Sequence, residues 1–180
     1  GFVSAVVISA LTLETTQWHL APAFPGSTSF FIIMLGGVAL VTVLLFILPP
    51  GITLKKGGHE WLLFPQGMRA LFGAGFLIEG VCGIMPSTFA IADGLTHITA
   101  AVLSLWTALL WNKGKIGRGG LLLTNLFGLL DIVMVAGGIA FVLLQDIGTH
   151  HNIMIASFYA APIFVALHVL SLQKLAMERR

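Results

Sequence analysis

Residues 29–48 read SFFIIMLGGVALVTVLLFIL, twenty positions without a charged side chain, and Pro49, Pro50 and Gly51 follow directly. An α-helix needs about 20 apolar residues to cross the hydrocarbon core of a bilayer. A pair of prolines with a glycine ends such a helix sharply. This stretch therefore predicts a transmembrane helix.

The other apolar stretches of the chain have similar lengths and are separated by short polar connections. Residues 1–13 are apolar too but are too short to cross a bilayer, so we expect a short or truncated sixth helix there. The predicted fold is all-α, a polytopic transmembrane helix bundle with five complete spans in one integral membrane domain, residues 1–180. The expected spans are about 1–17 (partial), 29–48, 67–85, 89–111, 120–144 and 153–173.

The composition excludes several classes of protein. Hydrophobic residues make up 57% of the chain and charged residues only 9%, whereas an average globular chain carries about 25% charged residues. The single cysteine, Cys82, excludes an internal disulfide and a thiolate zinc cluster, and its apolar surroundings predict a buried, inert thiol. No basic run with interleaved aromatic residues suggests nucleic-acid binding. The expected partners are the lipid bilayer and other membrane subunits.

The basic residues predict the orientation in the membrane. All nine Lys and Arg residues fall in the connections 49–69, 112–119 and 174–180, and none falls in 14–28, 86–88 or 145–152. Cytoplasmic loops are the ones enriched in Lys and Arg. The pattern therefore predicts a multi-pass protein of the cell membrane, typical of a bacterial inner membrane, with a cytoplasmic C-terminus.

Titratable residues inside the predicted spans are functional candidates, because charge is costly in hydrocarbon and such side chains face the bundle interior. A rise of about 1.5 Å per residue places Glu79, Asp93, His97 and Asp131 together in the outer half of the membrane. Asp93 and His97 are four residues apart and share one helix face. This group is expected to be a proton relay or a cation site, or else to join helices through hydrogen bonds between protonated acids and a neutral imidazole.

A second polar group is predicted in the inner half, formed by His168, Asn125 and Arg69. His168 could ligate a cofactor or could pack between helices. A haem shared by His97 and His168 is not expected, because their depths differ by roughly 10 Å, whereas a pigment with one axial histidine stays open.

Other cofactors and metals find little support in the sequence. No lysine lies within a span, which excludes a retinal Schiff base, and the identity of any cofactor is left unknown. No metal site is predicted inside the membrane. The only metal candidates are weak ones outside it, His19, His150 and His151.

Residues 65–175 resemble a group of uncharacterised bacterial multi-pass membrane proteins. The resemblance rests on the stretches 65–69 (PQGMR), 73–77 (GAGFL), Pro86 with Phe89 and Ala90, 125–131 (NLFGLLD), and Pro162 with His168, Ser171 and Leu172. These proteins have a Gly-x-Gly-Asp run where this chain has 94–97 (GLTH), so an imidazole replaces an acid. The resemblance implies a helical bundle and no particular activity.

The sequence is consistent with several classes of function. The first is a non-enzymatic bundle, either an accessory subunit or a small-ligand binder. The second is a proton- or cation-coupled carrier that uses the intramembrane acids and histidine, and the third is a pigment- or haem-binding protein. An enzyme comes last, because no nucleophile–base pair, phosphate loop or zinc-protease motif is present.

Overall fold

The computed structural model describes residues 27–47, 56–133, 156 and 160–178. These residues form helices and turns and contain no strand, which confirms the predicted all-α class for this part of the chain. The helices are α2 (Ser27–Ile47), α4 (Glu60–Leu63), the 3-10 helix η2 (Phe64–Met68), α5 (Arg69–Val81), α6 (Ser87–Asn112), α7 (Arg118–Leu130) and α10 (Ala161–Met177).

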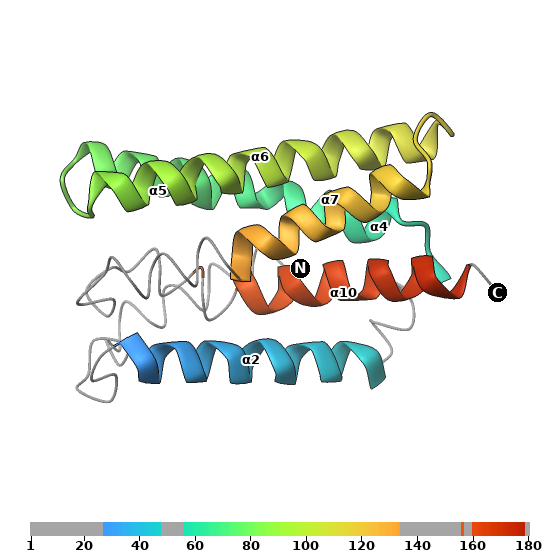
Figure 1. Cartoon of the computed structure of the whole chain (residues 1–180), viewed down its shortest axis with the longest axis horizontal. Helices are drawn as coiled ribbons and strands as arrows, with labels where there is room; N and C mark the ends of the chain where they lie inside the picture. Colours follow the sequence, from blue (N-terminus) through green and yellow to red (C-terminus); the bar gives the residue numbers. More distant parts are fainter. Residues whose placement is uncertain (1–26, 48–55, 134–155, 157–159, 179–180) are drawn as a thin grey trace.

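Helices α5 and α6 form a closely packed antiparallel hairpin (Figure 1). The chain reverses near Gly83, whose φ of 70° favours glycine. Small residues let the two backbones approach, as is common in membrane helix pairs. A Cβ atom on Gly73 would lie 2.5 Å from the carbonyl oxygen of Gly94, and one on Gly80 would lie 2.5 Å from the Cβ of Ala90. Larger side chains at these positions would push the hairpin apart.

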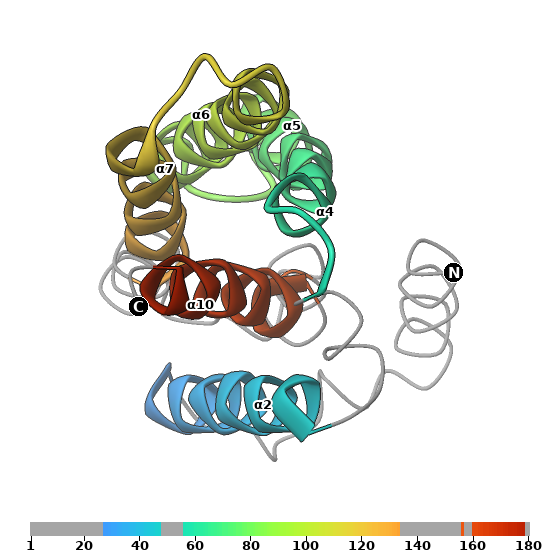
Figure 2. The ribbon, with the colours of Figure 1, turned by 90° about the vertical axis from the view of Figure 1, so that its right-hand side faces the viewer.

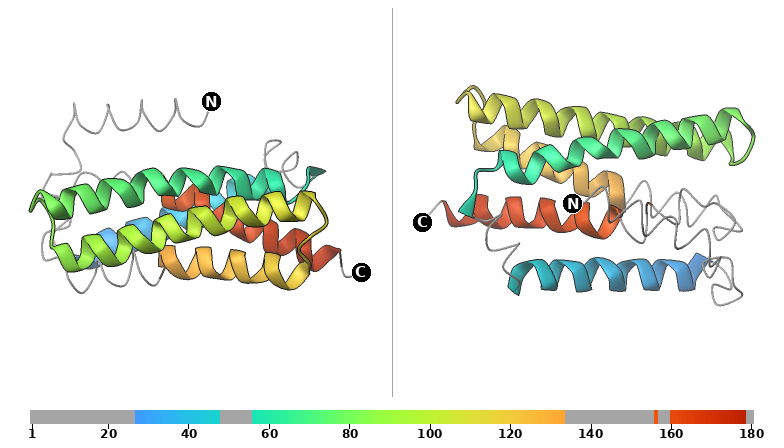
Figure 3. Two further views of the ribbon diagram at one scale, coloured as in Figure 1. Left: turned by 90° about the horizontal axis from the view of Figure 1, so that it is seen from above. Right: turned by 180° about the vertical axis from the view of Figure 1, so that it is seen from behind.

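The remaining helices complete a bundle around a shared interior. Viewed along the bundle, α4, α5, α6, α7 and α10 surround this interior, and α2 lies outside it against α10 (Figure 2). The views from above and behind show the same arrangement, with α5 alongside α6 and α2 alongside α10 (Figure 3). The position of α2 agrees with its sequence, since it supplies no titratable side chain.

Apolar side chains cover much of the outside of this bundle, while polar side chains lie within it. Leu71 and Leu123 are each 69% exposed and Val102 is 56% exposed, whereas Arg69, Asn125 and His168 are completely buried. Within the described residues, two helical segments, Glu60–Val81 and Ser87–Asn112, are long and apolar enough to cross a membrane.

The second helical segment begins earlier than the sequence pattern predicts. The expected span starts at residue 67, after Pro65, but helical structure already begins at Glu60 and passes through Pro65 in the 3-10 helix η2. Pro65 stands at the start of η2, where its missing N–H group costs no helical hydrogen bond. Arg69 consequently lies within the helical segment and is fully buried, rather than in a basic connection.

Two further expectations concern Cys82 and the later spans. Cys82 is exposed rather than buried, because it caps the C-terminus of α5 where the chain turns away from its neighbours. The expected span 120–144 is described only as α7 and a π turn at 131–133. The rest of that span, the partial span 1–17 and most of 153–159 lie outside the described residues.

Candidate functional site

Asp93 and His97 lie one turn apart on α6 and both face the bundle interior. Asp93 is 1% exposed and His97 is 6% exposed. Their spacing on a helix brings Nδ1 of His97 within 3.4 Å of Oδ1 of Asp93. The neighbouring Gly94 and Gly73 hold α5 close to this face of α6. The pair is therefore fixed on a rigid, tightly packed hairpin.

Asp131 reaches the same point from the opposite helix. It follows the last residue of α7 and begins the π turn at 131–133, a local widening often found at functional positions. Its Oδ2 atom lies 3.0 Å from Nδ1 of His97, and it is 1% exposed. Asp93, His97 and Asp131, named here the outer triad, offer one ligand atom each, all within 4.8 Å of one another.

Arg69 joins the outer triad to the inner polar group. Its Nη2 atom donates to Oδ2 of Asp131 in a fully buried ion pair. Its Nη1 atom donates to the carbonyl oxygen of Gly128 and to Nε2 of His168, both at 3.2 Å. Room for these contacts depends on Gly128, because a Cβ atom there would lie 2.1 Å from Nε2 of His168. The two polar groups expected from the sequence thus meet at Arg69.

Beyond Arg69, hydrogen bonds continue toward the other end of the bundle. Nδ1 of His168 and Oδ1 of Asn125 are 3.0 Å apart, and Nδ2 of Asn125 donates to Oγ of Ser171 at 3.1 Å. Ser171 in turn lies 3.0 Å from Nδ1 of His59, whose Nε2 is 3.4 Å from Glu178. We call His168, Asn125, Ser171 and His59 the inner chain.

Arg69 fixes the tautomer of His168 at the start of the inner chain. A guanidinium only donates, so Nε2 of His168 must accept and its proton must lie on Nδ1, facing Asn125. The amide of Asn125 then donates to Oγ of Ser171, which also makes a hydrogen bond with Nδ1 of His59. Both ring nitrogens of His168 are therefore occupied within the protein, which leaves neither available to ligate a cofactor.

The outer triad lacks such a complete set of partners. Within the residues that the structure describes, both carboxylate oxygens of Asp93 and Oδ1 of Asp131 are buried without a hydrogen-bond partner. Nδ1 of His97 also makes no hydrogen bond there, although two carboxylate oxygens lie within 3.4 Å. Buried polar atoms without partners are rare and costly. Their concentration at one point indicates a site where a bound species would supply the interactions that these atoms lack.

Several expectations about the site change with the structure. Glu79 is only partly buried on α5 and does not belong to the compact triad. His59, which the sequence places in a polar connection, is 1% exposed and ends the inner chain, packed edge-on against Trp111 with ring centroids 5.1 Å apart. Burial lowers the pKa of His59. The weak metal candidates His19, His150 and His151 lie outside the described residues.

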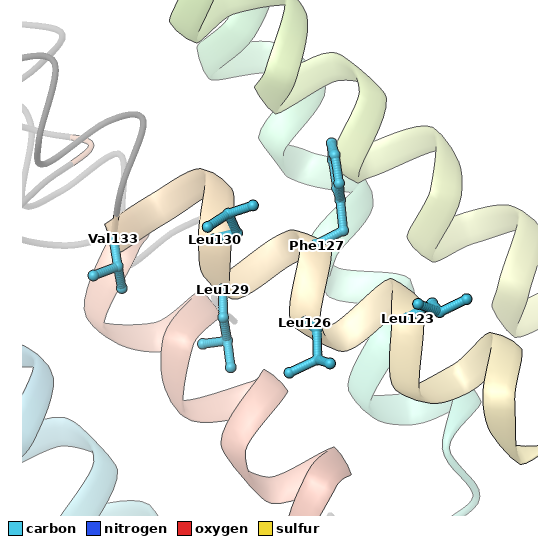
Figure 4. Close-up of a pocket in the computed structure, with 6 residues that line it drawn as sticks. All are labelled: Leu123, Leu126, Phe127, Leu129, Leu130 and Val133. Carbon is cyan, nitrogen blue, oxygen red and sulfur yellow. The ribbon is translucent and has the colours of Figure 1, made fainter.

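A hollow on α7 is separate from this polar interior. Figure 4 shows its apolar lining, and none of the outer triad or inner chain contributes to it. The lining residues are Leu123, Leu126, Phe127, Leu129, Leu130 and Val133. Such a surface offers no group for chemistry or for charge recognition, so it is not the candidate site.

Comparisons with known proteins give a family but no activity. Residues 28–176 match the model of a family described as "Domain of unknown function (DUF8737)", and the match covers most of the chain, including the outer triad and the inner chain. No curated protein matches the sequence, and no solved structure matches the fold.

Proposed function

We propose that this chain, which belongs to the DUF8737 family, is an integral membrane protein that binds a cation inside its helix bundle. The proposed role is that of a cation-coupled carrier. The observation that carries the proposal is the outer triad, in which both carboxylate oxygens of Asp93 and Oδ1 of Asp131 are buried without a hydrogen-bond partner within the described residues.

The distribution of side chains supports a membrane setting. Large apolar side chains are exposed along α5, α6 and α7, and the polar ones are enclosed, the reverse of a water-soluble protein. The start of α4, the turn between α6 and α7, and the end of α10 lie at the same end of the bundle (Figure 1). Lys56, Lys113, Lys115 and Lys174 belong to that end, which on the positive-inside pattern is cytoplasmic.

The charges of the interior support a bound cation. Asp93 and Asp131 are two carboxylates, while Arg69 is the one guanidinium beside them. The cluster is thus one positive charge short when both acids are ionised. A buried uncompensated charge is strongly unfavourable, so a cation among the free oxygens would stabilise the bundle.

A purely structural role explains only part of the polar interior. It accounts for the inner chain, where hydrogen bonds link α4, α7 and α10. It does not account for the outer triad, where both oxygens of Asp93 and Oδ1 of Asp131 accept no hydrogen bond from the described residues. We therefore assign the structural role to the inner chain and the binding role to the outer triad.

The membrane setting can be tested with the native cysteine. Cys82 is exposed and caps the C-terminus of α5. The turn between α5 and α6 lies at the end of the bundle opposite the turn between α6 and α7, the segment that contains Lys115 (Figure 1). A membrane-impermeant maleimide should label Cys82 in intact cells and not in inverted vesicles. The same reagent should label Lys115→Cys, in a Cys82→Ser background, in inverted vesicles and not in intact cells. The opposite pattern would reverse the orientation, and labelling of both sites from the same side would overturn the membrane-spanning arrangement.

The cation site can be tested by thermal unfolding of the detergent-purified protein after dialysis against a chelator. Na⁺, K⁺, Mg²⁺, Ca²⁺, Mn²⁺, Co²⁺ and Zn²⁺ would be added singly. At least one ion should raise the Tm, because a ligand at 100 times its Kd stabilises the folded state by about 2.7 kcal/mol. Asp93→Asn should abolish this response and Ser104→Ala, a buried substitution elsewhere on α6, should keep it. No response to any ion would refute the proposal.

A further inference from the structure

We propose that the ion bound by Asp93, His97 and Asp131 is a divalent first-row transition metal, such as Mn²⁺, Fe²⁺, Co²⁺ or Zn²⁺. This inference rests on the proposed cation site and names the class of ion that it takes. Two observations carry it: the spacing of the ligand atoms, and the presence of an imidazole nitrogen among them.

Two of the three spacings, those from Nδ1 of His97 to each carboxylate, are typical of atoms bound to one metal ion. Transition-metal bonds to imidazole nitrogen and carboxylate oxygen are about 2.0–2.2 Å long. Two ligands at that distance are about 3.0 Å apart in octahedral geometry and about 3.4 Å apart in tetrahedral geometry. Nδ1 of His97 lies 3.0 Å from Oδ2 of Asp131 and 3.4 Å from Oδ1 of Asp93.

Those short distances do not come from hydrogen bonds. Nδ1 of His97 makes no hydrogen bond to any described residue, although both carboxylates are close enough. A ring nitrogen that shares a ligand sphere with the carboxylates points its lone pair at the ion rather than at an oxygen. The arrangement of the three side chains therefore fits ligands around a common centre better than a hydrogen-bonded cluster.

The chemistry of the donor atoms narrows the choice of ion. Charge balance alone favours a monovalent ion, since a divalent ion leaves the cluster with one net positive charge, so the donor atoms decide the choice. Hard cations such as Mg²⁺ and Ca²⁺ prefer oxygen ligands only. Imidazole suits first-row transition metals, and carboxylates accept the same ions. The remaining oxygens of Asp93 and Asp131 can complete the coordination. The set of one nitrogen and several oxygens thus favours a divalent transition metal.

Arg69 would act as a positioning residue for this site. Its Nη2 atom donates to Asp131, and its Nη1 atom is anchored on Gly128 and His168. Hydrogen bonds to a ligating carboxylate from such outer partners orient metal ligands in many sites. His168 then serves the outer triad indirectly, because it accepts a hydrogen bond from Nη1 of Arg69 and so anchors that side chain.

The proposal can be tested with Co²⁺ on the full chain purified into lipid nanodiscs and stripped with a chelator. Co²⁺ binding would be followed by visible absorption bands and by metal content after gel filtration. The wild-type protein should retain one Co²⁺ ion per chain. His97→Gln and Asp93→Asn should each raise the Kd for Co²⁺ more than about 10-fold, since loss of an outer partner alone costs 10–100-fold.

His59→Gln is the matched control, because it also removes a buried imidazole but lies outside the outer triad. It should keep the Co²⁺ absorption and stoichiometry of the wild type. Retention of Co²⁺ by folded His97→Gln with wild-type affinity would overturn the inference. So would a wild-type protein that binds no Co²⁺ but is stabilised by Na⁺ in an Asp93-dependent manner, although the cation site itself would then stand. No response to any ion would remove both proposals.

Discussion

The outer triad and the inner chain are built from similar residues but differ in how their polar atoms are used. Both lie in the same interior, both contain a histidine with less than 7% exposure, and both contact Arg69 directly. In the inner chain, each ring nitrogen of His168 and each end of the Asn125 amide has a partner. In the outer triad, both oxygens of Asp93 lack a hydrogen-bond partner among the described residues.

This difference separates a structural role from a binding role. A network whose members all have partners stabilises one arrangement of helices, and nothing further is needed to complete it. A network with buried atoms lacking partners is unfavourable until a ligand, ion or proton supplies the missing interaction. Substitutions in the two regions should therefore fail in different ways, and each of the following experiments uses that contrast.

The largest effect is expected at the residue that both regions share. Arg69→Ala leaves Asp131 as a buried charge without its guanidinium, and breaking such a buried pair costs about 3–5 kcal/mol. Arg118→Ala is the control, because its pair with Glu178 is 3.9 Å long and over a third exposed on both sides, and surface pairs contribute about 1 kcal/mol at most. Unfolding in mixed micelles would measure the loss of stability in both variants. Equal losses would show that Arg69 does not hold the two regions together.

A steric test comes next in size. A Cβ atom at Gly128 would collide with His168, so Gly128→Ala should destabilise the fold by about 1–3 kcal/mol, the usual cost of overpacking. Gly119→Ala on the same helix meets nothing within 4 Å and should be neutral or slightly stabilising. The same unfolding assay applies. A neutral Gly128→Ala would mean that His168 and Arg69 can move apart without loss.

A crossed pair of substitutions sharpens the comparison most. Without added ions, Asn125→Ala should cost about 1 kcal/mol, since a membrane hydrogen bond averages about 0.6 kcal/mol and this amide makes several. Asp93→Asn should cost less than Asn125→Ala under the same conditions, because its oxygens have no hydrogen bond to lose within the described residues and only a 3.4 Å contact with His97. With the stabilising ion present, only Asn125→Ala should keep the ion response. A stable Asn125→Ala with a lost response would reverse the assigned roles.

The smallest effect concerns the end of the inner chain at His59. Burial lowers the pKa of His59, and this outweighs the opposing influence of Glu178. The unfolded chain therefore takes up a proton more readily, near the ordinary histidine pKa of about 6.5. Stability from this group should be complete above that pH and should fall as the pH drops toward the lowered pKa. His59→Gln should remove this part of the pH dependence between pH 7 and 5. If the stability of His59→Gln depends on pH in the same way as that of the wild type, the assigned contribution of His59 is wrong.

The sequence reveals the outer triad better than the inner chain, for a physical reason. The spacing of Asp93 and His97 fixes their common face, and helix depth brings Asp131 to their level. Arg69 is harder to place, because Pro65 signals a helix start that η2 passes through without interruption. The contact between His59 and Ser171 joins residues 112 positions apart and depends on tertiary packing, to which no local pattern points.

The metal site can be located directly by an anomalous difference map from crystals of the full chain grown with Co²⁺. We expect a peak among the side chains of Asp93, His97 and Asp131, at about 2.0–2.2 Å from Nδ1 of His97. We expect no peak along the inner chain. A map without density at the outer triad, or with Co²⁺ held by His59 and Glu178 instead, would show that the outer triad is not the metal site.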